Sequence, residues 1–470
     1  MRLILGIVLI CFLASAHTAV AAPVNQAPRP NFILLLVDDL GYGDFGCYGN
    51  ADVKTPQIDR LAAEGLRFTQ FYSNSPICSP SRTAWTTGQY PARWKITSYL
   101  ADRQRNAARG MANWLDPQAP TVARALQTAG YATGHFGKWH MGGQRDVGDA
   151  PLITEYGFET SLTQFYGLGE RILPLLDFHN GKPPEKHALG SDTLGRGEIT
   201  WMDRSVMTGA FTRRAIEFIK KSAGEGRPFY VNLWPDDVHG PLFPPGDSSA
   251  IADSQQRYLK VLEAMDSQLA PLFDFLRANP LIGENTIVFV TSDNGPVEGA
   301  GSTGSLRGHK AVLYEGGIRE PLIVWAPGRI RGDMAGRTNS TSWFAAIDVA
   351  RSILKLANVA EPPGIQWDGE DVSLTLLGKE EGSRSRPMFW GRPSYRPGSD
   401  EDQWPDVAVR DGSWKLLCQD DGSQGELFDL VKDPRETTNL ATKQSEVATR
   451  LTHAARDWVQ TIGKSSTRSP

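Results

Sequence analysis

Residues 31–39 read NFILLLVDD, a mostly apolar run followed directly by two aspartates. A short continuous apolar run of this kind predicts a strand covered on both faces, as in a parallel sheet. Three more runs share this pattern, namely Tyr131–Phe136 before Gly137-Lys138-Trp139-His140, Phe229–Trp234 before Pro235-Asp236-Asp237-Val238-His239, and Thr286–Thr291 before Ser292-Asp293-Asn294-Gly295. Because ligands bind beyond the carboxyl ends of strands in open α/β sheets, we expect the four polar clusters to share one crevice.

Helical patterns lie between these strands. Apolar residues spaced near 3.6, with Pro near a start or Gly past an end, predict helices over Ile58–Glu64, Thr121–Thr128, Phe211–Lys221, Gln256–Leu276 and Trp343–Ala357. The alternation predicts an α/β fold in which helices sandwich a large, mostly parallel sheet.

The pattern changes after Arg384. Short apolar runs at Val407–Val409, Trp414–Cys418 and Glu426–Leu430 predict antiparallel strands, and a helix is expected near Ser445–Thr461. We therefore expect a main α/β domain over residues 30–384 and a small α+β domain over residues 385–470.

The composition excludes several classes of protein. The chain has 470 residues, 49 Lys and Arg against 53 Asp and Glu, and 13 Trp, 19 Phe and 12 Tyr. So many aromatic residues can fill a core, which excludes a mainly disordered chain. A formal net charge of −4 gives no bulk attraction to nucleic acid or to an anionic membrane, so neither is expected as a partner.

The N-terminus has the features of a secretory signal. Arg2 precedes an apolar run over residues 3–13, and Ala19-Val20-Ala21 supplies small residues for cleavage. We expect residues 1–21 to be removed and the protein to reach a periplasmic, secreted or lysosome-like compartment. The alternative is a retained membrane anchor, but the run is shorter than the roughly 20 residues that a membrane span needs. No insertion into a membrane is expected.

Cys47, Cys78 and Cys418 remain after this removal. An odd number of cysteines in an exported protein indicates that one thiol has another role. A Cys47–Cys418 disulfide is an open alternative, and Cys78 is the thiol that needs an explanation.

Two acidic pairs, Asp38-Asp39 and Asp293-Asn294, follow two of the predicted strands. Their hard oxygen atoms suit Ca²⁺ or Mg²⁺ better than zinc. Both members of a pair can reach one ion only past the strand end, because neighbouring side chains within a strand point to opposite faces. Each pair alone is also typical of a turn, but together they favour a metal site.

Residues 78–82 read CSPSR, and Thr87-Gly88 follow. Proline is tolerated at the first helical position, so we expect a helix from Pro80, capped by Ser79 or the preceding turn. Cys78 would then lie at a helix N-terminus that favours an anion, with the guanidinium of Arg82 over the same face. The alternative is an ordinary capped helix beside an inert thiol.

This motif resembles the signature of the formylglycine-dependent sulfatases, a family within the alkaline-phosphatase superfamily. The other clusters follow in that family's order and context: Asp38-Asp39, Gly137-Lys138-Trp139-His140-Met141-Gly142, His239-Gly240-Pro241, Ser292-Asp293-Asn294-Gly295, Lys310 before Glu315-Gly316-Gly317-Ile318-Arg319, and Glu426-Leu427-Phe428-Asp429-Leu430 with Asp433-Pro434 and Asn439-Leu440. The resemblance extends from about Asn31 to Ala441. Thr86 departs from the usual Leu at a packing position.

The resemblance implies a role for each site residue. Cys78 would be oxidised to formylglycine by a formylglycine-generating enzyme, and Arg82 would hold the hydrated aldehyde. One Ca²⁺, favoured over Mg²⁺, would be bound by Asp38, Asp39, Asp293, Asn294 and an oxygen of the modified Cys78. Lys138 and Lys310 would bind the sulfate. His140 would remove a proton from the second hydroxyl, and His239 would contact the substrate and protonate the leaving alcohol.

The function implied is hydrolysis of sulfate esters, of sulfated carbohydrates or of aryl sulfates. Two alternatives stay open: a phosphate mono- or diester hydrolase, which would use a serine and extra metal-binding histidines, and a non-catalytic glycan-binding relative, which would lack site residues. Arg319, within a mainly structural motif, is one further residue that could reach the site. His309 and Asp236 could contact substrate. We expect specificity to be set by Gln144–Asp203 and Arg392–Asp406.

Overall fold

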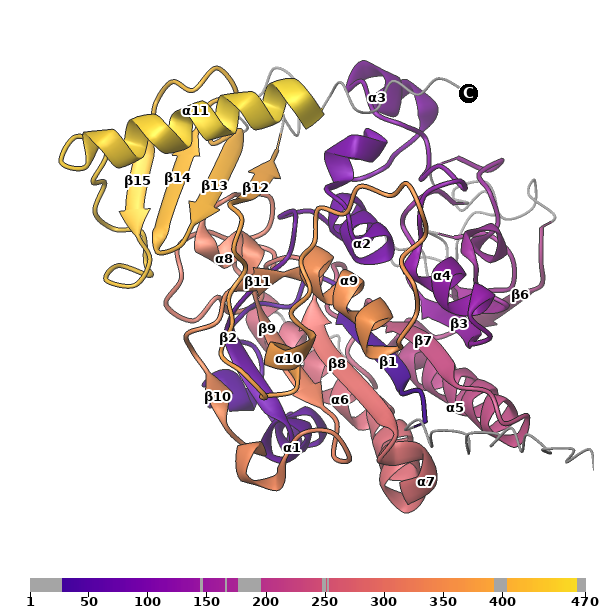
Figure 1. Cartoon of the computed structure of the whole chain (residues 1–470). Coiled ribbons are helices and arrows are strands. Elements are labelled where there is room, and N and C mark those ends of the chain that lie inside the picture. The colour runs from indigo at the N-terminus through magenta and orange to yellow at the C-terminus, as the bar shows by residue number, and fades with distance from the viewer. Residues whose placement is uncertain are drawn as a thin grey trace, which may run out of the picture.

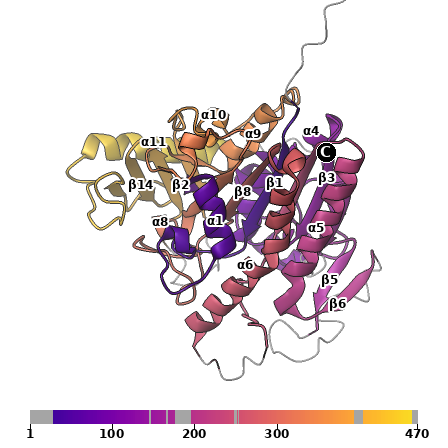
Figure 2. The ribbon, with the colours of Figure 1, turned by 90° about the horizontal axis from the view of Figure 1, so that it is seen from below.

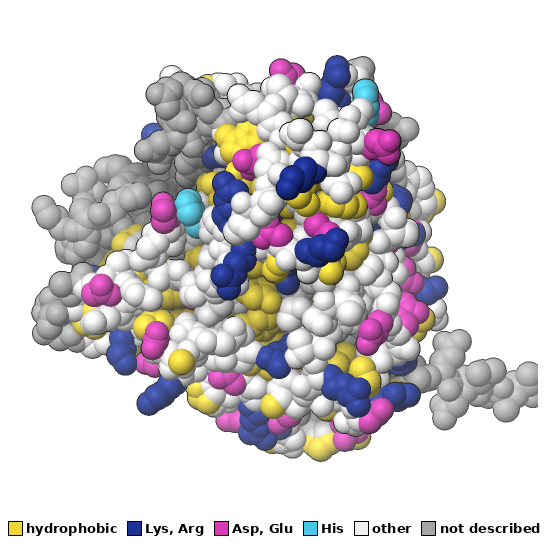
Figure 3. All heavy atoms as spheres, turned by 90° about the vertical axis from the view of Figure 1, so that its left-hand side faces the viewer, with side chains coloured by type: hydrophobic (Ala, Val, Ile, Leu, Met, Phe, Trp, Pro, Cys, Tyr) yellow, Lys and Arg dark blue, Asp and Glu magenta, His cyan; other side chains and the backbone are white. Residues whose placement is uncertain are grey.

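The computed structural model describes residues 28–143, 147–164, 167–175, 196–246, 251, 253–392 and 404–462. The predicted signal peptide lies outside these residues, as do most of the expected specificity loop 392–406 and parts of the expected specificity segment 144–203. Within the described residues no helix is both long and apolar enough to cross a bilayer. On the face drawn in Figure 3, basic and acidic side chains are interspersed, in keeping with the small net charge.

The larger sheet has the strand order β10-β2-β9-β8-β1-β7-β3-β4-β5-β6, and β11 also pairs with β2. Its strands are β1 (Asn31–Val37), β2 (Leu66–Tyr72), β3 (Ala132–Gly137), β4 (Thr160–Thr163), β5 (Arg171–Pro174), β6 (Ile199–Met202), β7 (Phe229–Trp234), β8 (Thr286–Ser292), β9 (Arg319–Trp325), β10 (Thr338–Asn339) and β11 (Phe344–Ala345). All pairings are parallel except those that β9 makes with β2 and β8. The expected mostly parallel sheet is confirmed.

Helices cover both faces of this sheet. They are α1 (Pro56–Glu64), α2 (Cys78–Thr87), α3 (Arg103–Ala108), α4 (Val122–Thr128), α5 (Met207–Gly224), α6 (Ser254–Ala278), α7 (Pro280–Gly283), α8 (Glu315–Ile318), α9 (Ala346–Leu356) and α10 (Ser373–Leu376). Figure 2 shows α5 and α6 on one side of β1 and β8, with α4 and α9 on the other. Alternate residues of β1 supply both cores, since Phe32 packs in the α4–α9 layer and Ile33 in the α5–α6 layer.

The smaller sheet is antiparallel, in the order β12 (Met388–Gly391), β13 (Val407–Asp411), β14 (Trp414–Cys418) and β15 (Glu426–Asp429). Helix α11 (Ser445–Ile462) lies across one face of it (Figure 1). Val407 and Val409 pack towards α11, whereas Ala408 packs in a cluster with Tyr72 and Ile347 of the main sheet region. The small α+β unit is thus present, and the division of the chain at residue 384 stays a prediction.

The predicted helices are present, with starts displaced by at most four residues, and two of these displacements have a clear local cause. Helix α2 begins at Cys78 rather than Pro80, and Ser79 instead accepts a hydrogen bond from the Leu100 amide at 3.0 Å. The first four N–H groups of a helix have no partner within it, so proline fits there without loss. The helix predicted from Trp343 begins only at Ala346, because Phe344 and Ala345 pair with β2.

The alternative of a Cys47–Cys418 disulfide is wrong, because both residues are unbonded thiols. Cys47 lies in a short helical turn, where its amide donates to Asp59 at 2.7 Å. Cys418 is buried at the end of β14.

Candidate active site

The four polar clusters follow neighbouring strands, because β8, β1, β7 and β3 are consecutive in the sheet. Backbone hydrogen bonds continue just past the strand ends. The Asp38 amide donates to Pro235 at 3.1 Å, and the Asp293 amide donates to Val37 at 3.2 Å. The parallel register therefore brings side chains that are more than 250 positions apart in the chain to one edge.

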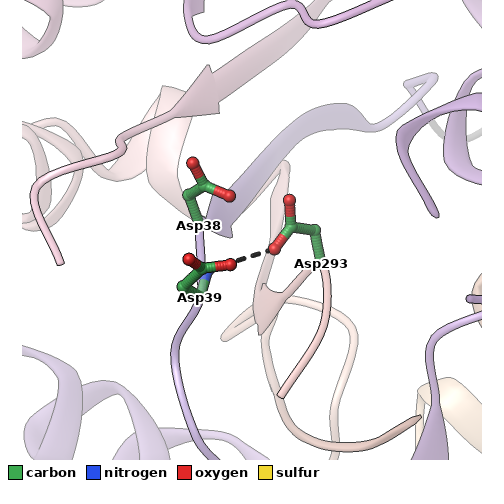
Figure 4. A group of neighbouring side chains, drawn as sticks. All are labelled: Asp38, Asp39 and Asp293. Atoms are coloured by element: carbon green, nitrogen blue, oxygen red, sulfur yellow. Dashed lines mark hydrogen bonds between the residues drawn. The ribbon is translucent and has the colours of Figure 1, made fainter. Parts of the chain in front are cut away.

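Asp38, Asp39 and Asp293 form a buried acidic group at this edge (Figure 4). Each offers an oxygen, and the three oxygens lie within 4.8 Å of one another. Asp39 has a φ of 57°, so the backbone turns sharply and both aspartates of the pair can face the same point. The Asp39 amide also donates to Asp293 Oδ1 at 3.2 Å. The turn past the strand end is the geometry that a shared ion requires.

The oxygen atoms of this group fit a hard divalent cation. Asp38 Oδ1 and Asn294 Oδ1 are buried and accept no hydrogen bond from the residues that the structure describes, although Asp38 Oδ1 lies 3.4 Å from Arg82 Nη2. A buried oxygen without a donor is costly, and a cation would satisfy it. Asn294 is oriented by its own amide, which donates to Asp39 Oδ1 at 2.8 Å. Three carboxylates and an amide oxygen are a donor set for Ca²⁺ or Mg²⁺ rather than for zinc.

Three cations surround the acidic group. Lys138 donates to Asp38, and Lys310 donates to both oxygens of Asp39 at 2.6 and 2.7 Å. The guanidinium of Arg82 contacts Asp293 Oδ2 at 2.8 and 2.9 Å. The site therefore holds three positive and three negative side chains that are largely buried.

The pKa values of the carboxyls reflect this balance. Burial and the neighbouring Asp38 raise the pKa of Asp293 to about 7, although Arg82 opposes them. Burial also favours the neutral form of Asp38, but the charges of Lys138 and Arg82 outweigh it and hold the pKa of Asp38 well below its usual range. Of the two, Asp293 is the carboxyl whose ionised form gains most from a bound cation.

Cys78 is the first residue of α2 and is almost fully buried. Its Sγ lies 3.2 Å from His140 Nδ1. Burial raises the pKa of the thiol even though Lys138 and Lys310 oppose it. Cysteine nucleophiles react as thiolates, so this environment does not favour catalysis by an unmodified Cys78.

Two histidines face the same place from different strand ends. His140 follows β3 and has a φ of 56°. The turn before it needs Gly137, because a Cβ there would lie 2.2 Å from the Trp234 carbonyl oxygen. His239 follows β7, and its Nε2 lies 3.8 Å from Asp39 Oδ2. Burial, reinforced by Lys138, holds the pKa of both imidazoles well below the ordinary value.

Three residues that flank the site have other partners. Arg319 donates to the Thr69 carbonyl at 2.6 Å and lies 3.4 Å from Glu315, so its role is structural. Asp236 is buried, and Gln164 donates to it at 2.6 Å. His309 Nε2 lies 3.4 Å from Glu298 and is partly exposed.

Two residues beside the site were not singled out from the sequence, although Gln164 lies within the stretch 144–203 that was expected to set specificity. Arg204 and Gln164 both contact Asp236, in the loop that carries His239. They come from the segment between β4 and α5, where no motif marks them. Only the fold brings them to the loop.

Comparison with known proteins identifies the family. Residues 30–359 match the sulfatase family, and residues 308–460 match the C-terminal part of N-sulphoglucosamine sulphohydrolase. The chain is 33% identical to N-acetylgalactosamine-6-sulfatase of Canis lupus familiaris over 78% of this chain and 69% of that protein. It is 31% identical to arylsulfatase A of Homo sapiens over 90% of this chain and 85% of that protein.

A solved structure agrees with these sequence matches. The PsFucS1 sulfatase from Pseudoalteromonas sp. superimposes with a TM-score of 0.72 and 25% identity, covering 94% of this chain and 92% of that one. The resemblance inferred from the motifs is confirmed, and the alignment covers nearly the whole described chain. The chain belongs to the sulfatase family and is a sulfuric ester hydrolase.

Proposed function

We propose that this protein is an exported sulfatase that uses a formylglycine, made from Cys78, and one Ca²⁺ ion to release inorganic sulfate from sulfated carbohydrates or aryl sulfates. The position of Cys78 carries the proposal: its sulfur lies at the start of α2, beside His140 and among the cations that surround the acidic group. The similarity to N-acetylgalactosamine-6-sulfatase and arylsulfatase A supports the substrate class.

The proposed metal ligands are Asp38, Asp39, Asp293, Asn294 and an oxygen of the modified Cys78. Their oxygen chemistry and the two oxygens without a donor support this assignment. When bound, Ca²⁺ supplies positive charge that stabilises developing negative charge and lowers the pKa of a hydroxyl group.

The modified residue acts as the nucleophile. A two-electron oxidation by a formylglycine-generating enzyme, with molecular oxygen as the electron acceptor, breaks the C–S bond of Cys78, releases the sulfur as hydrogen sulfide and leaves Cβ as an aldehyde. Water then adds to the aldehyde to give two hydroxyls. One hydroxyl oxygen attacks sulfur, and the bond from sulfur to the substrate oxygen breaks. The second hydroxyl then loses its proton, the C–O bond to sulfate breaks, and the aldehyde forms again. This covalent route divides one difficult displacement into two easier steps.

The surrounding residues supply charge and protons. Lys138 and Lys310 bind the sulfate oxygens, and Arg82 orients the hydroxyls of the modified residue. Fixed cations of this kind are each worth about 3 kcal/mol in a dry site. The negative charge of a bound sulfate ester favours the protonated imidazole of His239, which then gives its Nε2 proton to the leaving alcohol. His140, which lies 3.2 Å from the Cys78 sulfur, accepts the proton of the second hydroxyl.

Mass spectrometry of the peptide that contains Cys78 tests the proposal, using protein made together with a formylglycine-generating enzyme. We expect a mass about 18 Da below that of the thiol and release of inorganic sulfate from 4-nitrophenyl sulfate. Cys78→Ala should fold normally and release no sulfate. Sulfate release by this variant, or hydrolysis of 4-nitrophenyl phosphate in its place, would contradict the proposal and favour the phosphatase alternative.

Export is part of the same proposal and has its own test. When the chain is expressed in a host that exports it, N-terminal sequencing of the mature protein should begin after about Ala21. Retention of residues 1–21 in a membrane fraction would favour the anchor.

A further inference from the structure

The loop that carries His239 is held by an arginine from another part of the chain. Arg204 lies in a short helical turn (Arg204–Val206) just before α5, and its side chain is 4% exposed. Nη1 donates to Asp236 Oδ2 at 3.0 Å, and Nη2 donates to the Asp236 carbonyl at 2.7 Å. Nη2 also donates to the His239 carbonyl at 3.3 Å. One guanidinium thus reaches both ends of the turn from Asp236 to His239.

The same turn is closed from within. The His239 amide donates to the Asp236 carbonyl at 3.1 Å, and Gln164 donates to the Asp236 side chain at 2.6 Å. Beyond the turn, His239 Nδ1 lies 2.8 Å from the Gly240 carbonyl oxygen and donates to it, because a carbonyl oxygen can only accept. This bond directs Nε2 towards the acidic group, 3.8 Å from Asp39. The imidazole side chain stays 16% exposed, so a substrate can reach it.

We propose that Arg204 is a positioning residue for His239, and that it sets the efficiency with which the enzyme expels poor leaving groups. The inference rests on the proposed function, in which His239 protonates the leaving alcohol. Both Nη atoms of Arg204 are engaged with Asp236 and the His239 carbonyl, so it acts by holding the backbone of the turn rather than by contacting the substrate.

The chemistry of the side chain explains why arginine is needed there. A planar guanidinium can donate to two carbonyls and a carboxylate at once, whereas an ammonium is a point charge on a flexible stem. Loss of these bonds lets the turn and the imidazole shift. A misplacement of about 1 Å can reduce a reaction rate about 100-fold.

The test compares substrates that differ in their need for an acid. A phenol with a pKa of about 7 leaves without protonation, whereas one with a pKa of about 10 benefits from it. We expect Arg204→Met to slow hydrolysis of phenyl sulfate about 10- to 100-fold and that of 4-nitrophenyl sulfate less than about threefold. Arg204→Lys should give an intermediate loss, and it provides a measurement if the Met variant does not fold.

Two reference variants make the outcomes distinct. His239→Ala should show the same selectivity in a stronger form. Arg214 lies on the neighbouring α5 and forms a half-exposed ion pair with Glu170. Arg214→Met removes this pair and should leave both rates unchanged. The formylglycine content and the thermal shift on adding Ca²⁺ should equal those of the wild type in every Arg204 variant.

An equal loss on both substrates in the Arg204 variants, alongside a selective loss in His239→Ala, would overturn the positioning role and leave the proposed function intact. An equal loss in His239→Ala would show that the acid assignment of the proposed function is wrong, and the inference about Arg204 would fail with it. The mass of the Cys78 peptide tests the nucleophile separately in both cases.

Discussion

Two clusters of buried charge lie in this protein, and they differ in how completely their oxygens are used. The site cluster comprises Asp38, Asp39, Asp293, Asn294, Arg82, Lys138 and Lys310. The interface cluster comprises Glu315, Glu436, Lys415, Arg410 and Tyr72, where the small sheet meets the main one. In the interface cluster every carboxylate oxygen has a partner at 2.6–2.9 Å, whereas in the site cluster Asp38 Oδ1 lies 3.4 Å from Arg82 Nη2, and Asn294 Oδ1 accepts no hydrogen bond from the described residues.

The charged and polar groups of the interface cluster bond to one another. Lys415 Nζ lies 2.9 Å from Glu315 Oε1 and 2.8 Å from Glu436 Oε1. Tyr72 donates to Glu315 Oε2 at 2.7 Å, and the Glu315 amide donates to Glu436 Oε2 at 2.6 Å. Arg410 adds a bond to Tyr72. Such a closed network joins β14 to α8 and offers no donor set to a ligand.

This difference predicts a role in ligand binding for the site cluster and a role in stability for the interface cluster. An oxygen without a donor costs free energy unless a ligand satisfies it, so the site cluster is arranged for binding. A closed buried network holds its parts in one geometry, and removal of a single member leaves a charge uncompensated. Variants of the first cluster should therefore lose activity, and variants of the second should lose stability.

The largest effect is expected from Asn294→Ala. This change removes an oxygen proposed to bind the metal and the amide that orients Asp39. We expect kcat/KM for 4-nitrophenyl sulfate to fall about 100-fold or more, since even residues behind metal ligands account for 10- to 100-fold. Steady-state kinetics and the melting temperature would be measured together. Activity close to the wild type would show that Asn294 is not a ligand.

Metal removal should affect the two clusters differently. EDTA should abolish activity and lower Tm, and Ca²⁺ should restore both. At a hundredfold excess over its Kd, an ion that binds only the folded state contributes about 2.7 kcal/mol to the free energy of unfolding. Differential scanning calorimetry should show this shift in Lys415→Met and not in Asn294→Ala. Recovery with zinc alone would contradict the calcium assignment.

Lys415→Met should act on stability. It leaves Glu315 and Glu436 buried without the ammonium between them, a change that typically costs about 3–5 kcal/mol. Urea unfolding followed by circular dichroism would measure the loss. At a temperature where the variant is folded, its kcat should stay within about threefold of the wild type. A large fall in kcat without a fall in stability would break the distinction between the clusters.

The smallest predicted effect is a change in the free energy of unfolding with pH. Burial, together with Glu315, raises the pKa of Glu436 from 4.5 to about 7. The folded state then binds a proton that the unfolded state has released, so this group's contribution to stability falls as the pH rises from about 4.5 to about 7. Glu436→Gln removes the titration. The difference in free energy of unfolding between wild type and variant should change by about 1–3 kcal/mol between pH 5 and pH 7.5.

Urea unfolding of both proteins at the two pH values measures this change. Other carboxyls with raised pKa values, such as Asp266, are present in both proteins and cancel in the comparison. A difference that does not vary with pH would show that Glu436 titrates normally.

Much of the site was predictable because its residues lie in local motifs. The apolar run before Asp38 must be a covered strand, and the CSPSR stretch predicts a helix start with Cys78 at its tip. Both predictions depend on neighbours in the sequence, where backbone preferences and hydrophobic spacing act. The helix began two residues earlier than expected, since the first turn does not need the N–H that proline lacks.

Other features depend on contacts between distant segments. Strand β9 is antiparallel to both of its neighbours, and Phe344 joins the sheet instead of the helix that its spacing suggested. Arg319 was one residue that could reach the site, but the fold directs it to Thr69. Arg204 carries no local signal at all.

The sequence by itself determined the α/β class, the strand-end clusters and the family motif around Cys78, because short-range periodicity and residue chemistry specify them. Only the tertiary structure decided that β8, β1, β7 and β3 lie side by side, that two oxygens of the site have no donor among the described residues, and that Arg204 holds the His239 turn. Strand order and register follow from packing of the whole chain, and no local pattern encodes them.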